Sequence, residues 1–201
     1  MTSFSFKKSN GKLFDANSAA GKQALRETNL KGKMAESLVF DLLKESGNEV
    51  YNIGIEHSLP ALMHVRRELM GSRVGEKLRS IPDFFVLDSN KRAHIVEVKF
   101  RWHPKGHESD IVRLRKLAQL WDETIVIFVN CSKKPYFQYS ETPYVKEKTV
   151  LLEPIYEYVP FGVKENLLDK FDELVEKYLK PTLKAPLPKD SAIIDHSAHY
   201  L

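Results

Sequence analysis

Two acidic residues and a lysine stand out because of their positions relative to two short apolar segments. Asp83 comes directly before segment 84–87, Glu97 lies near the end of segment 93–98, and Lys99 directly follows it. Side chains alternate between the two faces of a strand, so Glu97 and Lys99 would share one face. Two carboxylates and a lysine on one face of a strand pair would suit metal-assisted hydrolysis.

The residues between the two segments predict a hairpin. Segment 88–91 reads Asp-Ser-Asn-Lys, a cluster of turn-forming residues. A three-residue loop at 89–91 would set Asp83 opposite Glu97. Facing carboxylates repel each other, and a bound divalent cation or a shared proton would relieve that repulsion. The alternative is a surface hairpin with ordinary solvated charges, which does not require these three groups to share a face.

Segment 81–84 (Ile-Pro-Asp-Phe) followed by segment 97–99 (Glu-Val-Lys) resembles the motif of the PD-(D/E)XK nuclease superfamily. Many restriction endonucleases and junction resolvases share this fold. The resemblance covers roughly residues 31–130. It implies an α/β protein with a restriction-endonuclease-like αβββαβ core, in which helices flank a mixed central sheet. Here an inserted basic segment and a C-terminal helix would be added to that core.

The resemblance also implies an activity, namely the metal-dependent hydrolysis of phosphodiester bonds in DNA by an endonuclease. By the family pattern, Mg²⁺ would be bound by Asp83, by Glu97 and by the carbonyl group of Val98, and Mn²⁺ would substitute for it. Lys99 would orient or deprotonate the attacking water, and orienting it is the simpler role because a base needs a lowered pKa. The alternative is a catalytically inactive member of the fold that binds nucleic acid or acts in assembly.

Glu36 is a fourth candidate for the catalytic and metal-binding group. At about 100° per residue it lies at the margin of the apolar stripe of its predicted helix. Segment 32–36 is similar to a glycine-x-x-x-glutamate pattern of archaeal Holliday-junction resolvases. The alternative is a solvated helix glutamate. Ser37 stands where those resolvases usually have arginine, and residues 55–80 interrupt the approach to Asp83, which puts junction specificity in doubt.

Apolar periodicity predicts the elements that would position these residues. In chain order they are a loose arm or short helix at 19–28, a helix from residue 32 to Gly47, a strand at 50–55, the hairpin, a helix at 110–121, a strand at 124–129, an edge strand at 149–152 and an amphipathic helix at 163–179. We therefore expect an N-terminal arm (1–30), a nuclease core (31–153, with an insertion at about 56–80), a C-terminal helical region (154–180) and an extended tail (181–201).

Basic side chains around the motif would contact the phosphates of a nucleic acid. The insertion and the flanking elements contribute Arg66, Arg67, Arg73, Lys77, Arg79, Arg101, Arg113 and Lys116. The alternative for those in the insertion is a solvated charged helix. DNA is favoured over RNA because most of the resembling families act on it.

Composition restricts the remaining classes. The 201-residue chain carries a net charge of +4, which mildly favours a polyanionic partner. The single Cys131 excludes an internal disulfide and a cysteine-cluster zinc site. We expect no membrane segment, no nucleotide cofactor, and a cytoplasmic or otherwise intracellular protein that is not secreted. The helix at 163–179 would pack on its own core or form a homodimer surface.

Overall fold

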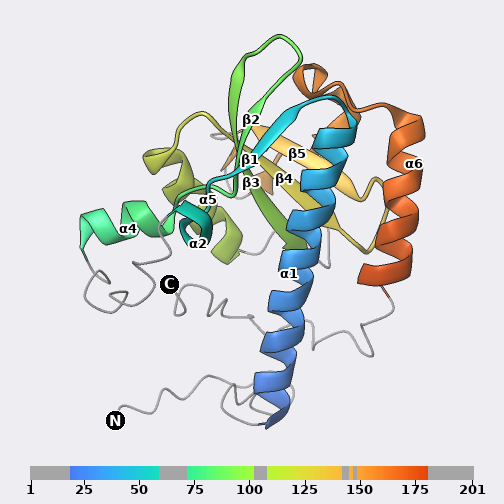
Figure 1. Cartoon of the computed structure of the whole chain (residues 1–201). Helices are drawn as coiled ribbons and strands as arrows, with labels where there is room; N and C mark the ends of the chain where they lie inside the picture. Colours follow the sequence, from blue (N-terminus) through green and yellow to red (C-terminus); the bar gives the residue numbers. More distant parts are fainter. Residues whose placement is uncertain (1–18, 59–71, 102–107, 142–144, 147–148, 181–201) are drawn as a thin grey trace.

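A six-stranded mixed sheet forms the centre of the molecule, with helices on both of its faces (Figure 1). The computed structural model describes residues 19–58, 72–101, 108–141, 145–146 and 149–180. Its strands are β1 (Glu49–Asn52), β2 (Phe84–Leu87), β3 (Ala93–Arg101), β4 (Thr124–Asn130), β5 (Phe137–Glu141) and β8 (Glu153–Pro154), which lie side by side in that order. The β3–β4 pair is parallel and the other pairs are antiparallel.

Helix α1 (Ala19–Glu45) is longer than the sequence pattern predicted. Residues 19–28 were expected to form an arm or a separate short helix, but they join the helix predicted from residue 32. The pattern underestimated this segment because it lacks an apolar stripe, although alanine, lysine, glutamine, arginine and glutamate are good helix formers. The helix ends at Glu45, and Gly47, two residues later, has a φ of 93°, which lies in the left-handed region that favours glycine.

The other α-helices of the described residues are α2 (Ile55–Ser58), α4 (Arg73–Arg79), α5 (Glu108–Leu120) and α6 (Glu165–Leu174). A π-helical turn (Val175–Leu179) continues α6, and two short 3-10 helices (Ile155–Glu157 and Val159–Phe161) precede it. The predicted strand at 50–55 ends at Asn52, because α2 begins at Ile55. The predicted edge strand at 149–152 does not join the main sheet; β7 (Thr149–Val150) pairs with β6 (Val145–Lys146) in a separate two-stranded sheet. In the described part of the chain, no helix is long and apolar enough to span a membrane.

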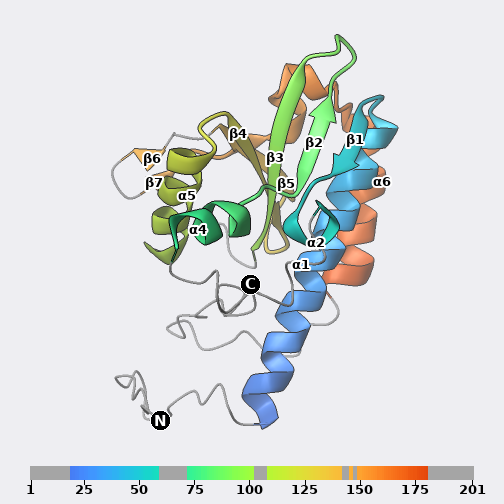
Figure 2. The same cartoon turned by 60° about the vertical axis from the view of Figure 1, so that its left-hand side comes forward.

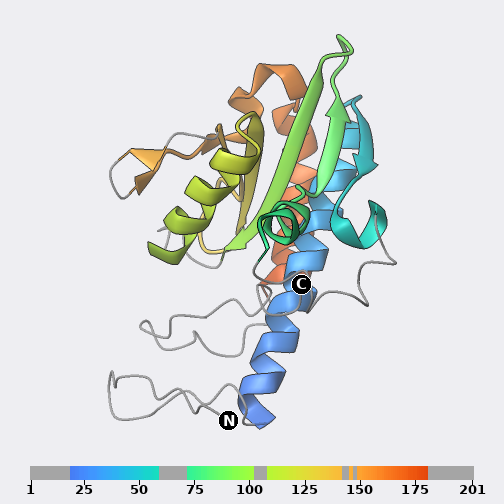
Figure 3. The same cartoon turned by 90° about the vertical axis from the view of Figure 1, so that its left-hand side faces the viewer.

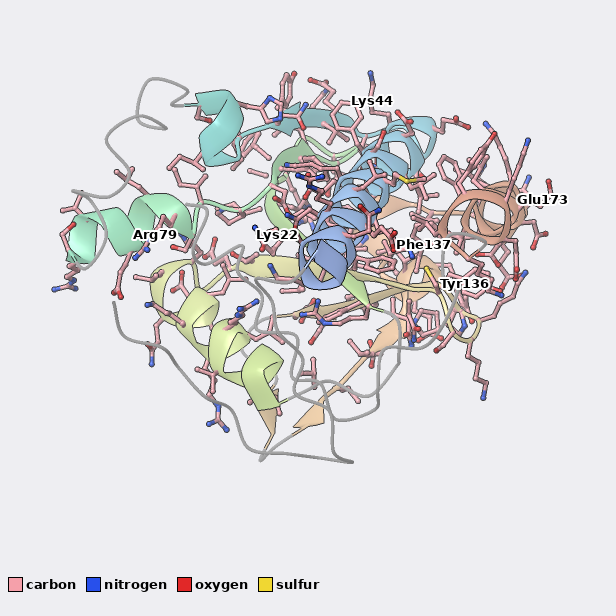
Figure 4. The ribbon with its side chains drawn as sticks, turned by 90° about the horizontal axis from the view of Figure 1, so that it is seen from below. Lys22, Lys44, Arg79, Tyr136, Phe137 and Glu173 are labelled. Atoms are coloured by element: carbon pink, nitrogen blue, oxygen red, sulfur yellow. The ribbon has the colours of Figure 1, made fainter. Side chains whose placement is uncertain are left out.

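Helices α1 and α6 cover one face of the sheet, and α5 covers part of the other (Figure 3). On the α1 side, Val39 and Leu42 are fully buried against the strands. On the α5 side, the helix packs against the fully buried Val126 of β4. Tyr136 and Phe137 lie between α1 and α6 (Figure 4). The side chains at the start of β5 therefore pack between the two helices.

The apolar face of α6 packs on the core of its own chain. Leu168, Phe171, Val175 and Leu179 are all buried there, and the Phe171 ring meets Phe137 edge-on at 6.4 Å between centroids. The sequence left two roles open for this helix, namely packing on its own core and forming a homodimer surface. The apolar face described here packs on the core.

Replacing Phe171 with alanine should lower the free energy of unfolding by about 3–5 kcal/mol, because it removes a buried ring and leaves a cavity. Urea denaturation followed by circular dichroism measures the change. Glu173→Ala is the matched control, since Glu173 is exposed on the outer side of the same helix (Figure 4). Equal stability of the two variants would contradict the packing described here.

A chain of polar contacts ties the β2–β3 hairpin to the segment before α6. Asp88 Oδ2 lies 3.2 Å from His94 Nε2, and His94 Nδ1 lies 3.3 Å from the hydroxyl group of Tyr158. Burial, together with the carboxylates of Glu141 and Asp88, raises the pKa of Tyr158 to about 12. Tyr158 is therefore held in its neutral form well above the pH at which an unfolded tyrosine ionises.

The free energy of unfolding should accordingly decrease with alkaline pH. The raised pKa of Tyr158 gives a contribution that is complete below the pKa of about 10 of an unfolded tyrosine and is lost as pH rises toward about 12. Urea midpoints measured from pH 8 to pH 11 test this. Tyr158→Phe should show a smaller alkaline loss, and an unchanged slope in that variant would assign the loss to other groups.

Candidate active site

The β2–β3 hairpin has the predicted register. Phe84 pairs with Val96 and Leu87 pairs with Ala93, so Asp83 stands just before the ladder, at the position opposite Glu97. The loop consists of residues 89–91, as predicted, and β3 extends to residue 101. The hairpin therefore places both acids at the same end of β2.

Asp88 holds the hairpin loop in place. Its Oδ1 atom accepts hydrogen bonds from the backbone N–H groups of Asn90 (2.8 Å) and Arg92 (2.9 Å). Lys91 has a φ of 62°, as is common at the third position of such loops. The sequence indicated a turn here, but it did not reveal these two hydrogen bonds to the Asp88 carboxylate. The pattern that could have predicted them is an aspartate followed, two and four residues later, by backbone N–H groups that can donate to it.

The Asp83 side chain replaces a strand partner for β3. Because β2 begins only at Phe84, its ladder does not continue to Val98, and Asp83 Oδ2 accepts the Val98 N–H at 2.7 Å. The main-chain carbonyl of Asp83 accepts from Ile53 (3.0 Å) and Gly54 (3.3 Å). One carboxylate oxygen is thus fixed against β3, and the whole residue is held between β1, β2 and β3.

Glu97 and Lys99 lie on the face of β3 that points away from α1. Val96 and Val98, which alternate with them, are buried in the core on the α1 side. Lys99 Nζ donates to Glu97 Oε1, and the two side chains are only 26% and 14% exposed. The predicted common face of these two residues is confirmed.

The charges in this corner of the sheet are unbalanced. Burial raises the pKa of Asp83 well above its usual range, and the neighbouring carboxylates of Glu97 and Glu36 raise it further, against the opposing effect of Lys99. For Lys99, burial would lower the pKa, but the carboxylates of Glu97 and Asp83 outweigh it and the pKa is raised. Lys99 is therefore a cation at neutral pH, which suits positioning a water better than removing its proton.

Glu36 lies near these groups but is not joined to them. It belongs to α1, where its Oε2 atom pairs with Lys33 Nζ at 3.1 Å, and its side chain is 29% exposed. Its charge nevertheless contributes to the raised pKa of Asp83. Among the described residues, no group of three or more histidine, cysteine, aspartate or glutamate side chains is gathered as a metal site. A metal-binding role for Glu36 stays a prediction.

The remaining predicted donors are two carboxylates and one carbonyl group. Asp83 and Glu97 provide hard oxygen atoms, which Mg²⁺ prefers, and the carbonyl group of Val98 belongs to the residue that follows Glu97. A dication would offset the repulsion by which the Glu97 carboxylate raises the pKa of Asp83. Their chemistry therefore fits a magnesium ion that keeps several of its waters.

Helix α4 brings part of the basic insertion next to α5. The Trp121 Nε1–H group donates to Ser80 Oγ at 3.2 Å, Lys116 Nζ pairs with Glu76 Oε1 at 2.8 Å, and Lys77 lies over the Trp121 ring. In Figure 4, Arg79 lies at the end of α4 that is nearest α5.

The basic residues that were predicted to contact phosphates lie on different elements. Arg73, Lys77 and Arg79 belong to α4, Arg113 and Lys116 to α5, and Arg101 to the end of β3. Arg66 and Arg67 lie outside the described residues. The charge of Lys116 is already balanced by Glu76, so its role as a free phosphate contact is weakened, whereas Arg73 and Lys77 are exposed.

No protein-family model matches the chain, and a search of curated proteins finds no significant match either.

Proposed function

We propose that this protein is a metal-dependent endonuclease of restriction-endonuclease-like fold that hydrolyses phosphodiester bonds in DNA. The observation that carries the proposal is the charge arrangement at the start of β2 and the middle of β3. Asp83 and Glu97 lie there beside Lys99, and burial together with Glu97 raises the pKa of Asp83. A protein gains little from such an arrangement unless a cation binds there. The order of helices and strands supports the fold assignment.

Each residue would have a distinct role. Asp83, Glu97 and the carbonyl of Val98 would hold Mg²⁺, with Mn²⁺ as a substitute. The bound ion would supply Lewis-acid stabilisation of charge on the phosphate. Lys99, as a cation with three N–H donors, would hold the attacking water and offset charge on the phosphate oxygens. The hydrogen bond from Val98 to Asp83 would keep one carboxylate oxygen fixed while the other faces the ion.

The basic residues of α4 support a polyanionic substrate. Arg73 and Lys77 are exposed, and α4 leads through residues 80–82 directly into Asp83. Phosphate contacts from this helix would position a strand beside the acids without reading its sequence.

A nicking assay on supercoiled plasmid tests the proposal. Wild type with Mg²⁺ or Mn²⁺ should convert the plasmid to nicked and linear forms, and chelation with EDTA should stop the reaction. Asp83→Ala and Lys99→Ala should leave the plasmid intact, whereas Asp169→Ala, which changes an exposed acid on α6, should cut as wild type does. If wild type leaves both the plasmid and single-stranded DNA intact while still binding them, the alternative of a non-catalytic DNA-binding protein replaces this proposal.

A further inference from the structure

An uncovered apolar strip lies on the same face of the sheet as Glu97 and Lys99. It consists of Tyr51, Phe85 and Ile95, which form one cross-strand row, since Tyr51 pairs with Phe85 and Phe85 pairs with Ile95. Val50, Phe84 and Val96, which alternate with them along the three strands, point into the core on the α1 side. We call this row the apolar strip.

None of the described helices covers the apolar strip. Helix α5 packs farther along the sheet, where Leu114 and Leu117 contact β4. Figure 2 shows β1, β2 and the upper part of β3 without a helix in front of them, while α5 lies over β4. Tyr51 is accordingly 48% exposed, and Phe85 and Ile95 are partly exposed.

The Tyr51 ring is held in position while it remains exposed. Its hydroxyl group donates to Glu49 Oε2 at 2.8 Å, and Glu49 in turn pairs with Lys91 from the hairpin loop. The ring lies 6.3 Å from that of Phe85, tilted by 45°. An aromatic surface whose orientation is already fixed loses little conformational entropy when a flat ligand stacks on it.

The apolar strip is one pleat repeat away from the acids. Ile95 and Glu97 are two residues apart on β3, a separation of about 7 Å, and Phe85 of β2 lies two residues after Asp83. A nucleotide beside the phosphate held at Asp83 and Glu97 could therefore reach the strip with its base.

We propose that the apolar strip is a stacking subsite for an unpaired base of the DNA strand that is cut. This inference rests on the proposed function and names its substrate class, which is single-stranded DNA or a duplex with an unpaired nucleotide beside the scissile bond. A base in an intact duplex is stacked between its neighbours, so only an unpaired base can present a face to Tyr51.

The residues of the apolar strip suit a stacked base better than a phosphate group or a protein partner. Phosphate contacts require cations, and the strip has none; the nearby Lys91 is already paired with Glu49. A stable protein interface buries about 800 Å² on each partner, which is more than the three residues of the apolar strip provide. One or two stacked bases match the size and chemistry of the strip.

Binding measured in EDTA tests this subsite without any strand cleavage. The probes are fluorescein-labelled DNA of about 20 nucleotides as a single strand, as a full duplex, and as a duplex with one unpaired adenine. Wild type should bind the first and third probes more tightly than the full duplex. Tyr51→Ala should weaken binding of those two probes roughly ten-fold, the effect of losing one base–aromatic stack, and should leave the full duplex unaffected.

Two variants serve as controls. Tyr51→Phe keeps the ring and should bind as wild type does, which separates stacking from the hydrogen bond to Glu49. Tyr178→Ala removes a tyrosine of similar exposure (45%) on the far side of the molecule and should change nothing. The proposal is overturned if Tyr51→Ala binds all three probes as wild type does, or loses affinity equally for all of them. It is also overturned if Tyr51→Ala changes only the oligomeric state in sedimentation.

The two proposals fail in different ways. If wild type nicks plasmid but Tyr51→Ala keeps the probe preference unchanged, the subsite is wrong and the endonuclease assignment stands. If wild type prefers unpaired DNA through Tyr51 but cuts nothing with Mg²⁺ or Mn²⁺, the subsite stands and the endonuclease assignment is wrong.

Discussion

Replacing Asp83 with asparagine is expected to reduce plasmid cleavage by at least roughly 10³-fold, because a neutral amide is a poor ligand for a hard dication whose contribution is several kcal/mol. The same change should raise the midpoint of urea denaturation of the metal-free protein. Burial and Glu97 raise the pKa of Asp83, so the native fold disfavours its charged form. Asparagine keeps an acceptor for the Val98 N–H and removes the repulsion.

Asp88→Asn provides the contrast within the same hairpin. The pKa of Asp88 is lowered by backbone hydrogen bonds, that from Arg92 first, and by His94, so the fold favours its charged form. This variant should denature at lower urea concentration than wild type, the opposite of Asp83→Asn. If Asp83→Asn is instead the less stable of the two, the carboxylate of Asp83 contributes to folding rather than to ion binding, and the site assignment is wrong.

Replacing Lys99 with methionine should lower the rate of cleavage by roughly 10²–10⁴-fold, the usual effect of losing a group that positions or transfers a proton. In contrast to Asp83→Asn, it should also destabilise the metal-free protein, on the order of 1–3 kcal/mol, because Glu97 is then left without its cationic partner. Single-turnover cleavage and urea denaturation measure the two effects separately.

Lys99→Arg is the matched control for charge. Arginine keeps the positive charge beside Glu97, so stability should stay close to that of wild type. Cleavage should remain impaired, because the planar guanidinium places its donors differently from an ammonium group. Full activity in Lys99→Arg would show that Lys99 neutralises charge and does not position the water.

The hairpin and its acids were predictable because their signals are local. Strand alternation and turn residues fix which side chains share a face, and a loop of known length fixes the register. The structure accordingly pairs Phe84 with Val96 and places Glu97 beside Lys99. The sequence also predicted the helices at 110–121 and 163–179 and the strand at 124–129. Long segments with helical periodicity or many β-branched residues distinguish helix from strand clearly.

Other features depend on contacts between distant segments. Strand β5 at 137–141 has only five residues and β8 only two; β5 pairs with the edge of β4, and β8 pairs with β5. The distance of Glu36 from Asp83 depends on how far α1 lies from the start of β2. Helical periodicity does not determine that distance. The pairing of Lys116 with Glu76 likewise requires knowing that α4 docks on α5. The apolar strip became evident only when the register showed Tyr51 beside Phe85.

The loop at residues 89–91 has a consequence for how this chain can vary. Exposed hairpin loops are commonly the places where a sequence gains or loses residues without harm. Here the carboxylate of Asp88 fixes the loop length, and β3 follows it without a break. One residue more or fewer would slide β3 against β2 and turn Glu97 toward α1. The proposed site therefore depends on the length of this small surface loop as much as on the two acids, although no residue of the loop would contact the substrate.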